Sequence, residues 1–182
     1  MRGDGFANIL CDLSILKENE ISYSWNTLRV GKKYDLLDSA QIEEYATQYL
    51  SEHPQETSQF IVDLACYDKA MPIDDILNKV ADTIDGKINI DTPKWELEKR
   101  KLRYCVLVYL KNHISDTREL LDKIALVYDD FGFPEDMEDF IYYMPAKKFN
   151  PLKYSEKECV DRLVRLFEIF LINEQKFLSN HR

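Results

Sequence analysis

The chain has 182 residues, of which 33 are acidic and 24 basic, so its formal net charge is −9, and 45% of its residues are hydrophobic. A net negative protein repels a phosphate backbone, which argues against a nucleic-acid partner, and the hydrophobic content argues against a disordered chain. Five glycines and six prolines are fewer than the turns of a sandwich or barrel need, which favours one helical domain over residues 1–182.

The first predicted elements precede Pro54. A short helix over Ile9–Lys17 and a second one that opens at Ser24 have the least regular patterns. From Asp38 the pattern sharpens, because Asp38 and Gln41 have the spacing of a capping box and apolar residues then recur on one helical face. Pro54 disfavours helical geometry in the residue before it and ends this helix.

Two helices and a connector follow. One helix spans about 56–67. The next begins with Pro72, whose missing N–H costs nothing in a first turn, and ends at Asp85-Gly86. Residues 87–91 alternate polar and apolar types, but an isolated strand has no partner to pair with. We interpret them as an extended connector, and 86–92 as the candidate internal boundary.

A long helix opens at Thr92 and Pro93, and its apolar residues, Trp95 and Leu102 among them, indicate a buried side. We expect its charged residues to form a solvated face: Glu96, Glu98, Lys99, Arg100, Lys101 and Arg103. A charged helical face usually points to water and carries no function of its own.

The carboxy-terminal helices have clear boundary signals. Asp116 opens a helix that Gly132 can close in the C′ position, and Pro134–Pro145 encloses a short helix. Ser155 caps the last helix, whose apolar seam needs a partner surface. We predict an all-α fold with compact, bundle-like packing of about six or seven helices joined by short connections.

No catalytic or metal-binding pattern is present. The three histidines are isolated from one another, and neither a phosphate-binding glycine loop nor a hydrolase serine elbow occurs. We therefore predict no catalytic residue, no metal site and no cofactor. An enzyme that assembles a metal site from carboxylates on facing helices is an alternative, although the chain lacks the Glu-x-x-His pairs of such sites.

The sequence also indicates a compartment. No stretch approaches the roughly 20 apolar residues that cross a bilayer, and Met1–Phe6 is too polar to begin a signal peptide. We expect a cytoplasmic protein with no membrane partner. The cysteines are widely spaced in apolar surroundings and predict reduced, largely buried thiols: Cys11, Cys66, Cys105 and Cys159.

The most unusual segment holds six carboxylates and no base: Asp129, Asp130, Glu135, Asp136, Glu138 and Asp139. The helix dipole favours carboxylates in a first turn, as at Glu135, but disfavours Asp129 and Asp130 near a helix end. The segment is a solvated acidic turn, a calcium site or a docking surface for a basic protein. Its spacing does not match an EF-hand loop, whereas aromatic residues such as Phe133 beside the charges are typical of interfaces.

Three segments carry a family resemblance: Trp95 with the charged helix after it, Val127–Asp136, and Phe140–Pro145. Together they resemble a bacterial family of domains of unknown function, and Ile42–Ala46 is similar in kind. The resemblance brings no catalytic residues to this chain. Small acidic bacterial proteins of this kind often look like immunity proteins that are encoded beside toxins, so the resemblance implies an immunity-type role.

We therefore hypothesise a cytoplasmic immunity-type protein that binds and inhibits a basic toxin domain. The expected contact residues are Asp129, Asp130, Phe133, Glu135, Asp136, Glu138 and Asp139. Their negative charge would speed the encounter, and the aromatic contacts would slow release. A helical adaptor for an unknown protein partner is the alternative function.

Overall fold

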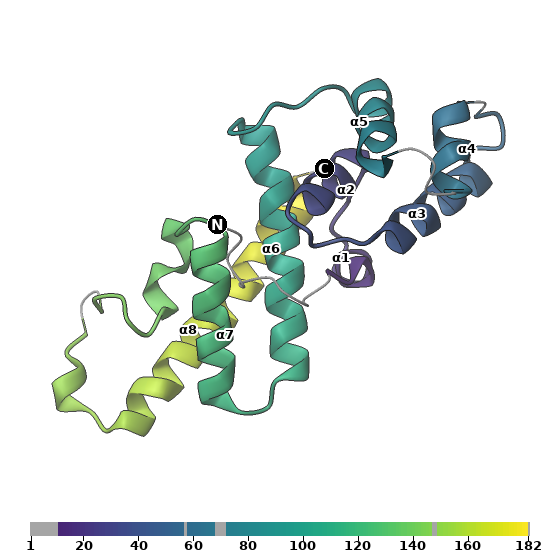
Figure 1. Ribbon diagram of the computed structural model, residues 1–182. Coiled ribbons are helices and arrows are strands. Elements are labelled where there is room, and N and C mark those ends of the chain that lie inside the picture. Colours follow the sequence, from purple (N-terminus) through teal and green to yellow (C-terminus); the bar gives the residue numbers. More distant parts are fainter. Residues whose placement is uncertain (1–10, 57, 68–71, 147–148, 182) are drawn as a thin grey trace. The chain divides into compact units, whose positions relative to one another are not determined.

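The computed structural model describes residues 11–56, 58–67, 72–146 and 149–181. Over these residues the chain forms α-helices and short 3-10 helices and no strand, so the all-α prediction is confirmed (Figure 1). The α-helices are α1 (Leu13–Glu18), α2 (Trp25–Lys33), α3 (Ser39–Glu52), α4 (Gln59–Ala65), α5 (Ile73–Ile84), α6 (Pro93–His113), α7 (Thr117–Asp130) and α8 (Glu156–Asn180). The 3-10 helices are η1 (Glu135–Phe140) and η2 (Pro151–Lys153).

The described residues form two compact units. Ser22–Leu102 form the inserted unit, and the described residues before Ser22 and after Leu102 form the split unit. The division falls within α6, whereas the expected boundary at 86–92 lies inside the inserted unit. The first half of α6 stays with the inserted unit because its side chains pack there, as when Thr27 Oγ1 donates a hydrogen bond to Glu98.

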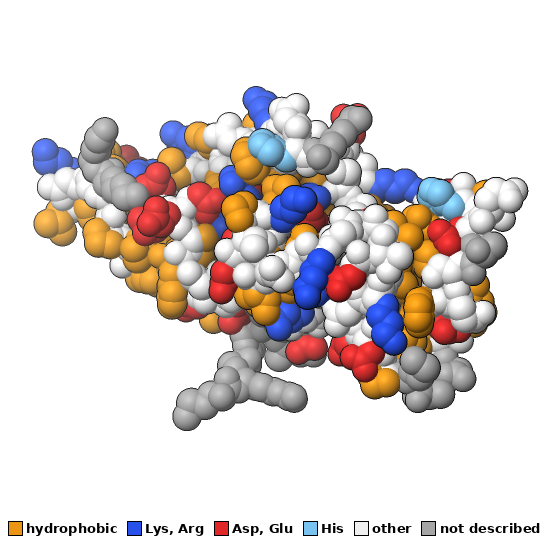
Figure 2. Space-filling model, turned by 90° about the horizontal axis from the view of Figure 1, so that it is seen from above, with side chains coloured by type: hydrophobic (Ala, Val, Ile, Leu, Met, Phe, Trp, Pro, Cys, Tyr) orange, Lys and Arg blue, Asp and Glu red, His pale blue; other side chains and the backbone are white. Residues whose placement is uncertain are grey.

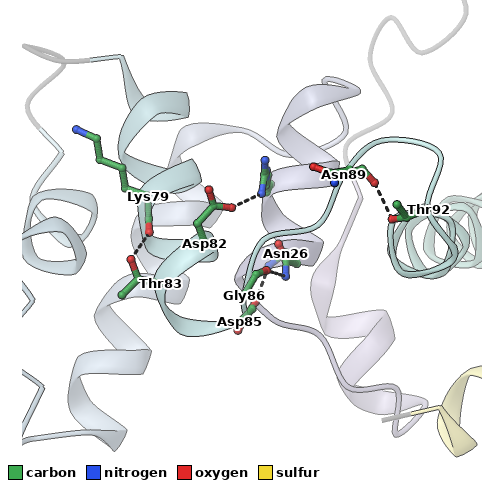
Figure 3. Close-up of polar contacts among 9 residues, drawn as sticks. Asn26, Lys79, Asp82, Thr83, Asp85, Gly86, Asn89 and Thr92 are labelled. Carbon is green, nitrogen blue, oxygen red and sulfur yellow. Dashed lines mark hydrogen bonds and ion pairs between the residues drawn. The ribbon is translucent and has the colours of Figure 1, made fainter.

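A polar joint connects α2 and α5 in the inserted unit. The backbone N–H of Asn26 donates to Asp85 Oδ2 at 2.7 Å, and the Asn26 side-chain amide donates to the Gly86 carbonyl at 3.1 Å (Figure 3). Gly86 has φ +82°, a conformation that side chains disfavour. Asp85 and Gly86 therefore end α5 as the sequence predicts, and the same two residues fix the start of α2.

Aromatic packing forms part of the inserted unit's core. Trp25 is buried, with its ring centroid 4.7 Å from that of Tyr45 and 5.2 Å from that of Tyr49, both in edge-on arrangements. The α3 residues come into place because the capping box of Asp38 and Gln41 forms as predicted. Helices α3, α4 and α5 then pack in sequence order.

In the split unit, α8 packs against α7 and η1. Phe140 of η1 lies between two rings of α8, with centroids 5.6 Å from Phe167 and 5.0 Å from Phe170. The predicted capping box of Ser155 and Glu158 begins α8. No helix in the described part of the chain combines the length and the apolar character that a membrane span requires.

The prediction that the charged residues of α6 form a solvated face is wrong for two of its cations. Lys101 is only 4% exposed and Arg103 only 5%, in a stretch of α6 in which every residue from Lys101 to Leu107 is buried. The buried charges are compensated by carboxylates. Lys101 Nζ lies 2.9 Å from Glu98, and Arg103 Nη2 lies 2.5 Å from Asp136.

Some other local predictions need correction. Helix α4 covers only part of the expected 56–67, and α1 begins at Leu13, although the first residues of the expected Ile9–Lys17 helix lie outside the described residues. The short helix after Pro134 ends at Phe140, before the expected stop at Pro145. None of the four cysteines forms a disulfide, and Cys11 and Cys105 are buried as expected, but Cys159 is only half-buried and Cys66, at the C-terminal end of α4, is exposed.

Candidate functional site

The acidic segment begins at a rigid helix end. Gly132 adopts φ +82° after α7, and its N–H donates to the Asp129 carbonyl at 3.1 Å, while the Phe133 N–H donates to the Tyr128 carbonyl at 2.9 Å. These two bonds define a Schellman motif with Gly132 at C′, as the sequence predicts. Phe133 itself has φ +59°, so the turn aims a bulky side chain outward in an unusual backbone conformation.

Exposed aromatic rings surround this turn. Phe133 is 60% exposed, and Tyr142 and Tyr143 are also exposed. Their rings are in contact through Tyr128, whose centroid lies 5.4 Å from Phe133 and 6.2 Å from Tyr143, and Tyr142 lies 5.3 Å from Tyr143. Large apolar groups in mutual contact at a surface mark an interaction site more often than single exposed residues do. The sequence shows Tyr142 and Tyr143 among the aromatic residues that accompany the acids, but the expected contact residues did not include them.

Asp129 connects the helix end to the segment after η1. The Tyr143 hydroxyl donates a hydrogen bond to Asp129 Oδ1 at 2.5 Å, which holds the two segments together across fourteen positions of sequence. Loss of surrounding water, and then this hydrogen bond, raise the pKa of Tyr143 above its ordinary value. The Asp129 carboxylate stays exposed and thus presents its charge at the surface while fixing the ring beside it.

Asp130 has the least favourable surroundings of the six carboxylates. Its Oδ2 atom is buried and has no hydrogen-bond partner among the described residues. Burial, and secondly the neighbouring charge of Asp129, raise the pKa of Asp130 above its ordinary value. The C-terminal end of α7 opposes negative charge as well. The free protein therefore keeps an ionised group here at a cost to its own stability.

Asp136 has a different role, because the molecule's own Arg103 neutralises it. Arg103 Nη2 lies 2.5 Å from Asp136 and 3.6 Å from Glu174 Oε1, and the guanidinium stands 5.7 Å from the Phe170 ring. Glu174 is only 3% exposed, so this network anchors η1 to α6 and α8 from within. Nothing in the local sequence could reveal a partner 33 residues away.

The remaining carboxylates line two sides of η1. Glu135 and Asp139 are exposed, whereas Glu138 is half-buried and lines a cavity of about 250 Å³ together with Asp139, Met144 and Leu163. The space-filling view shows acidic and hydrophobic side chains side by side at the left, where Figure 1 places the segment between α7 and α8 (Figure 2). Among the described residues, no three His, Cys, Asp or Glu side chains converge to hold a metal ion.

The geometry thus keeps part of the predicted set together. Asp129, Asp130, Phe133 and Glu135 lie where α7 passes into η1, and Tyr142 and Tyr143, which follow η1, join them through the hydrogen bond of Tyr143 to Asp129. We call these six residues the acidic-aromatic turn. Asp136 is paired with the buried Arg103 of α6. Glu138 and Asp139 border the neighbouring cavity. Exposed carboxylates around aromatic rings suit non-covalent recognition of a cationic protein surface.

Comparison with known proteins adds one finding. A family model described as an uncharacterized protein conserved in bacteria (DUF2247) matches residues 13–175. The match runs from the start of α1 into the last turns of α8 and so includes both units. No curated protein and no solved structure matches the chain.

Proposed function

Because the chain belongs to DUF2247, a family of uncharacterised proteins conserved in bacteria, we propose a function from its own surface: it binds a basic protein through the acidic-aromatic turn. The observation that carries the proposal is Asp130, whose buried Oδ2 has no hydrogen-bond partner among the described residues. A lysine or arginine of a partner would supply the missing cation. An ionised group that opposes folding at such a place is typical of a functional site rather than of a packing solution.

Affinity would come from the rings of the turn. Phe133, Tyr142 and Tyr143 are exposed but already ordered, by the Schellman motif and by the hydrogen bond to Asp129. Ordered aromatic anchors lose little conformational entropy on binding, which is why such residues dominate binding energies at many interfaces. The turn would therefore bind with little rearrangement.

The net charge of −9 would increase the rate of association with the partner. A strongly negative protein attracts a basic partner over distances of about a Debye length, roughly 8–10 Å at physiological salt. We infer an immunity-type role, in which the partner is the basic domain of a bacterial toxin and binding inhibits it. This finer proposal is supported by the acidic charge and by the resemblance of small acidic bacterial proteins to immunity proteins.

The experiment starts with co-purification from the native bacterium and identification of the bound protein. Association and dissociation rates are then measured by surface plasmon resonance at low and at physiological salt. Reversing Asp129 and Asp130 together to lysine should slow association at low salt by about tenfold or more, because steering depends on local charge. Phe133→Ala should mainly speed dissociation, because it removes a contact made after encounter.

A matched control makes the same change in net charge elsewhere. Glu43→Lys with Glu44→Lys reverses two adjacent carboxylates of α3 in the inserted unit and should slow association much less. Far-UV circular dichroism checks that each variant is folded. An association rate of the Asp129 and Asp130 variant equal to that of the control would remove the turn from consideration.

A further inference from the structure

A cavity in the inserted unit lies apart from the acidic-aromatic turn. It measures about 390 Å³, within the range of small-molecule sites, and opens between α2 and α5. Leu77 and Trp95, both buried, form an apolar part of its lining, and the exposed Ile90 of the α5–α6 connection stands beside it. An apolar lining of this kind favours the carbon body of an organic molecule.

Cations from one helix line the same cavity. Arg29, Lys32 and Lys33 all come from α2, although the protein as a whole is strongly acidic. Arg29 Nη1 is held by Asp82 at 2.7 Å, which restricts its rotamers while leaving other guanidinium donors to act. Lys32 and Lys33 have no ion-pair partner among the described residues, unlike the buried cations of α6.

Polar groups complete the lining. The Asn78 amide offers both a donor and an acceptor, and the carboxylates of Asp35 and Asp74 add acceptors. Asp74 lies in the first turn of α5, where the helix dipole stabilises its charge. Neither aspartate is paired with the lysines among the described residues, so charges of both signs border the cavity without cancelling in direct contact.

Trp95 contributes one more unused group. Its indole Nε1 is buried and has no hydrogen-bond partner in the described part of the chain. A buried donor without an acceptor is costly, and native proteins satisfy most such groups with protein, water or ligand. Because Trp95 also lines the cavity, an oxygen atom of a ligand seated there could act as that acceptor after a small shift of the ring.

We propose that this cavity binds a small organic anion. Its carboxylate or phosphate group lies against Lys32, Lys33 and Arg29, and its apolar or ring-shaped body lies on Leu77 and Trp95. The Asn78 amide and the two aspartates accept hydrogen bonds from amino or hydroxyl groups of the same molecule. This proposal stands independently of protein binding, because every residue that carries it belongs to the inserted unit.

The test is a titration of the full chain followed by tryptophan fluorescence and isothermal calorimetry. The organic anions tested are adenosine 5′-monophosphate, which carries a phosphate, and citrate, which carries carboxylates. Inorganic phosphate, an anion with no organic moiety, and adenosine, which is uncharged, are the comparison ligands. At least one of the two organic anions should bind with a Kd of about 1 mM or tighter, and it should bind at least tenfold better than inorganic phosphate and adenosine. The better of the two shows which anionic group the cavity prefers.

Two variants localise the binding. Lys32→Glu with Lys33→Glu should weaken it at least tenfold, and Ile90→Glu, at an exposed position beside the cavity, should weaken it without disturbing the core. Lys153→Glu with Lys157→Glu, two exposed lysines of the split unit, is the control with the same change in charge and should bind as the unmodified chain does. The proposal is overturned if neither organic anion binds, if adenosine or inorganic phosphate binds equally well, or if the α2 variant binds normally.

Discussion

Single carboxylates of the acidic segment differ sharply in their surroundings. Asp136 has Arg103 at 2.5 Å and serves the fold, whereas Asp130 carries a buried oxygen without a hydrogen-bond partner among the described residues. Both residues look alike in sequence, as acids of one segment rich in carboxylates and aromatic residues. Their roles separate because one of them faces a buried cation of another helix and the other does not.

Asp130 gives a prediction about pH. Its pKa is raised in the folded protein, so folding favours the protonated form; the resulting stability is present below the ordinary pKa and is lost as pH rises through the folded value. At neutral pH the ionised group therefore opposes folding. Asp130→Asn should raise the free energy of unfolding at pH 7 in urea denaturation, and this gain should shrink as the pH falls below about 4.

The control for this variant is Glu135→Gln, which neutralises an exposed carboxylate of the same turn and should change stability by less than about 0.5 kcal/mol. Although Asp130→Asn should stabilise the free protein, it should weaken binding to the partner. If Asp130→Asn lowered stability at pH 7, Asp130 would have a favourable contact in the folded protein and the proposed function would lose its main support.

At the scale of elements, the end of α7 determines how the turn is presented. The Schellman motif ends the helix within one residue of Asp130, and the positive φ angles of Gly132 and Phe133 redirect the chain into η1. Arg103 then holds η1 through Asp136. The turn is thus fixed at both ends, by a backbone motif and by the ion pair of Asp136 with the buried Arg103.

Gly132→Ala tests the helix end. A β-carbon at Gly132 would meet nothing within 4 Å, so the substitution should be unfavourable only because alanine disfavours a positive φ. We expect the free energy of unfolding, measured by urea denaturation, to fall by about 1 kcal/mol. Gly132→Asn should cost less, because asparagine tolerates this conformation better. Gly86→Ala, with the same φ of +82° and equally open space, is the matched control and should cost a similar amount. A neutral Gly132→Ala variant would show that the turn adopts another conformation in solution.

At the scale of the whole molecule, one helix belongs to both units. Leu102 is the last residue of the inserted unit and Arg103 returns to the split unit, yet α6 continues without a break from Pro93 to His113. Disrupting α6 in either unit removes backbone hydrogen bonds at the edge of the other. We therefore expect the two units to unfold together.

The two tryptophans make this prediction testable. Trp25 and Trp95 both lie in the inserted unit, so their fluorescence reports that unit, while far-UV circular dichroism reports the helices of both. The two urea transitions should coincide. Arg103→Met in the split unit removes a buried cation and should lower the urea midpoints of both transitions. The corresponding loss in the free energy of unfolding should be about 3–5 kcal/mol. Arg118→Met breaks an exposed pair with Glu156 and should cost under about 1 kcal/mol. A fluorescence midpoint that Arg103→Met leaves unchanged would mean that the units unfold independently.

Local signals in the sequence were sufficient for the helical class, the capping boxes at Asp38 and Ser155, and the helix ends at Gly86 and Gly132. Each depends on a few neighbouring residues, on dihedral preferences and on hydrogen bonds within one turn. Only the tertiary structure decided that Lys101 and Arg103 are buried, that Asp136 is neutralised, and that cations of α2 share a cavity with Trp95. These features depend on which residues distant in sequence meet in space, because burial and charge compensation come from those partners and leave no periodic pattern in the chain.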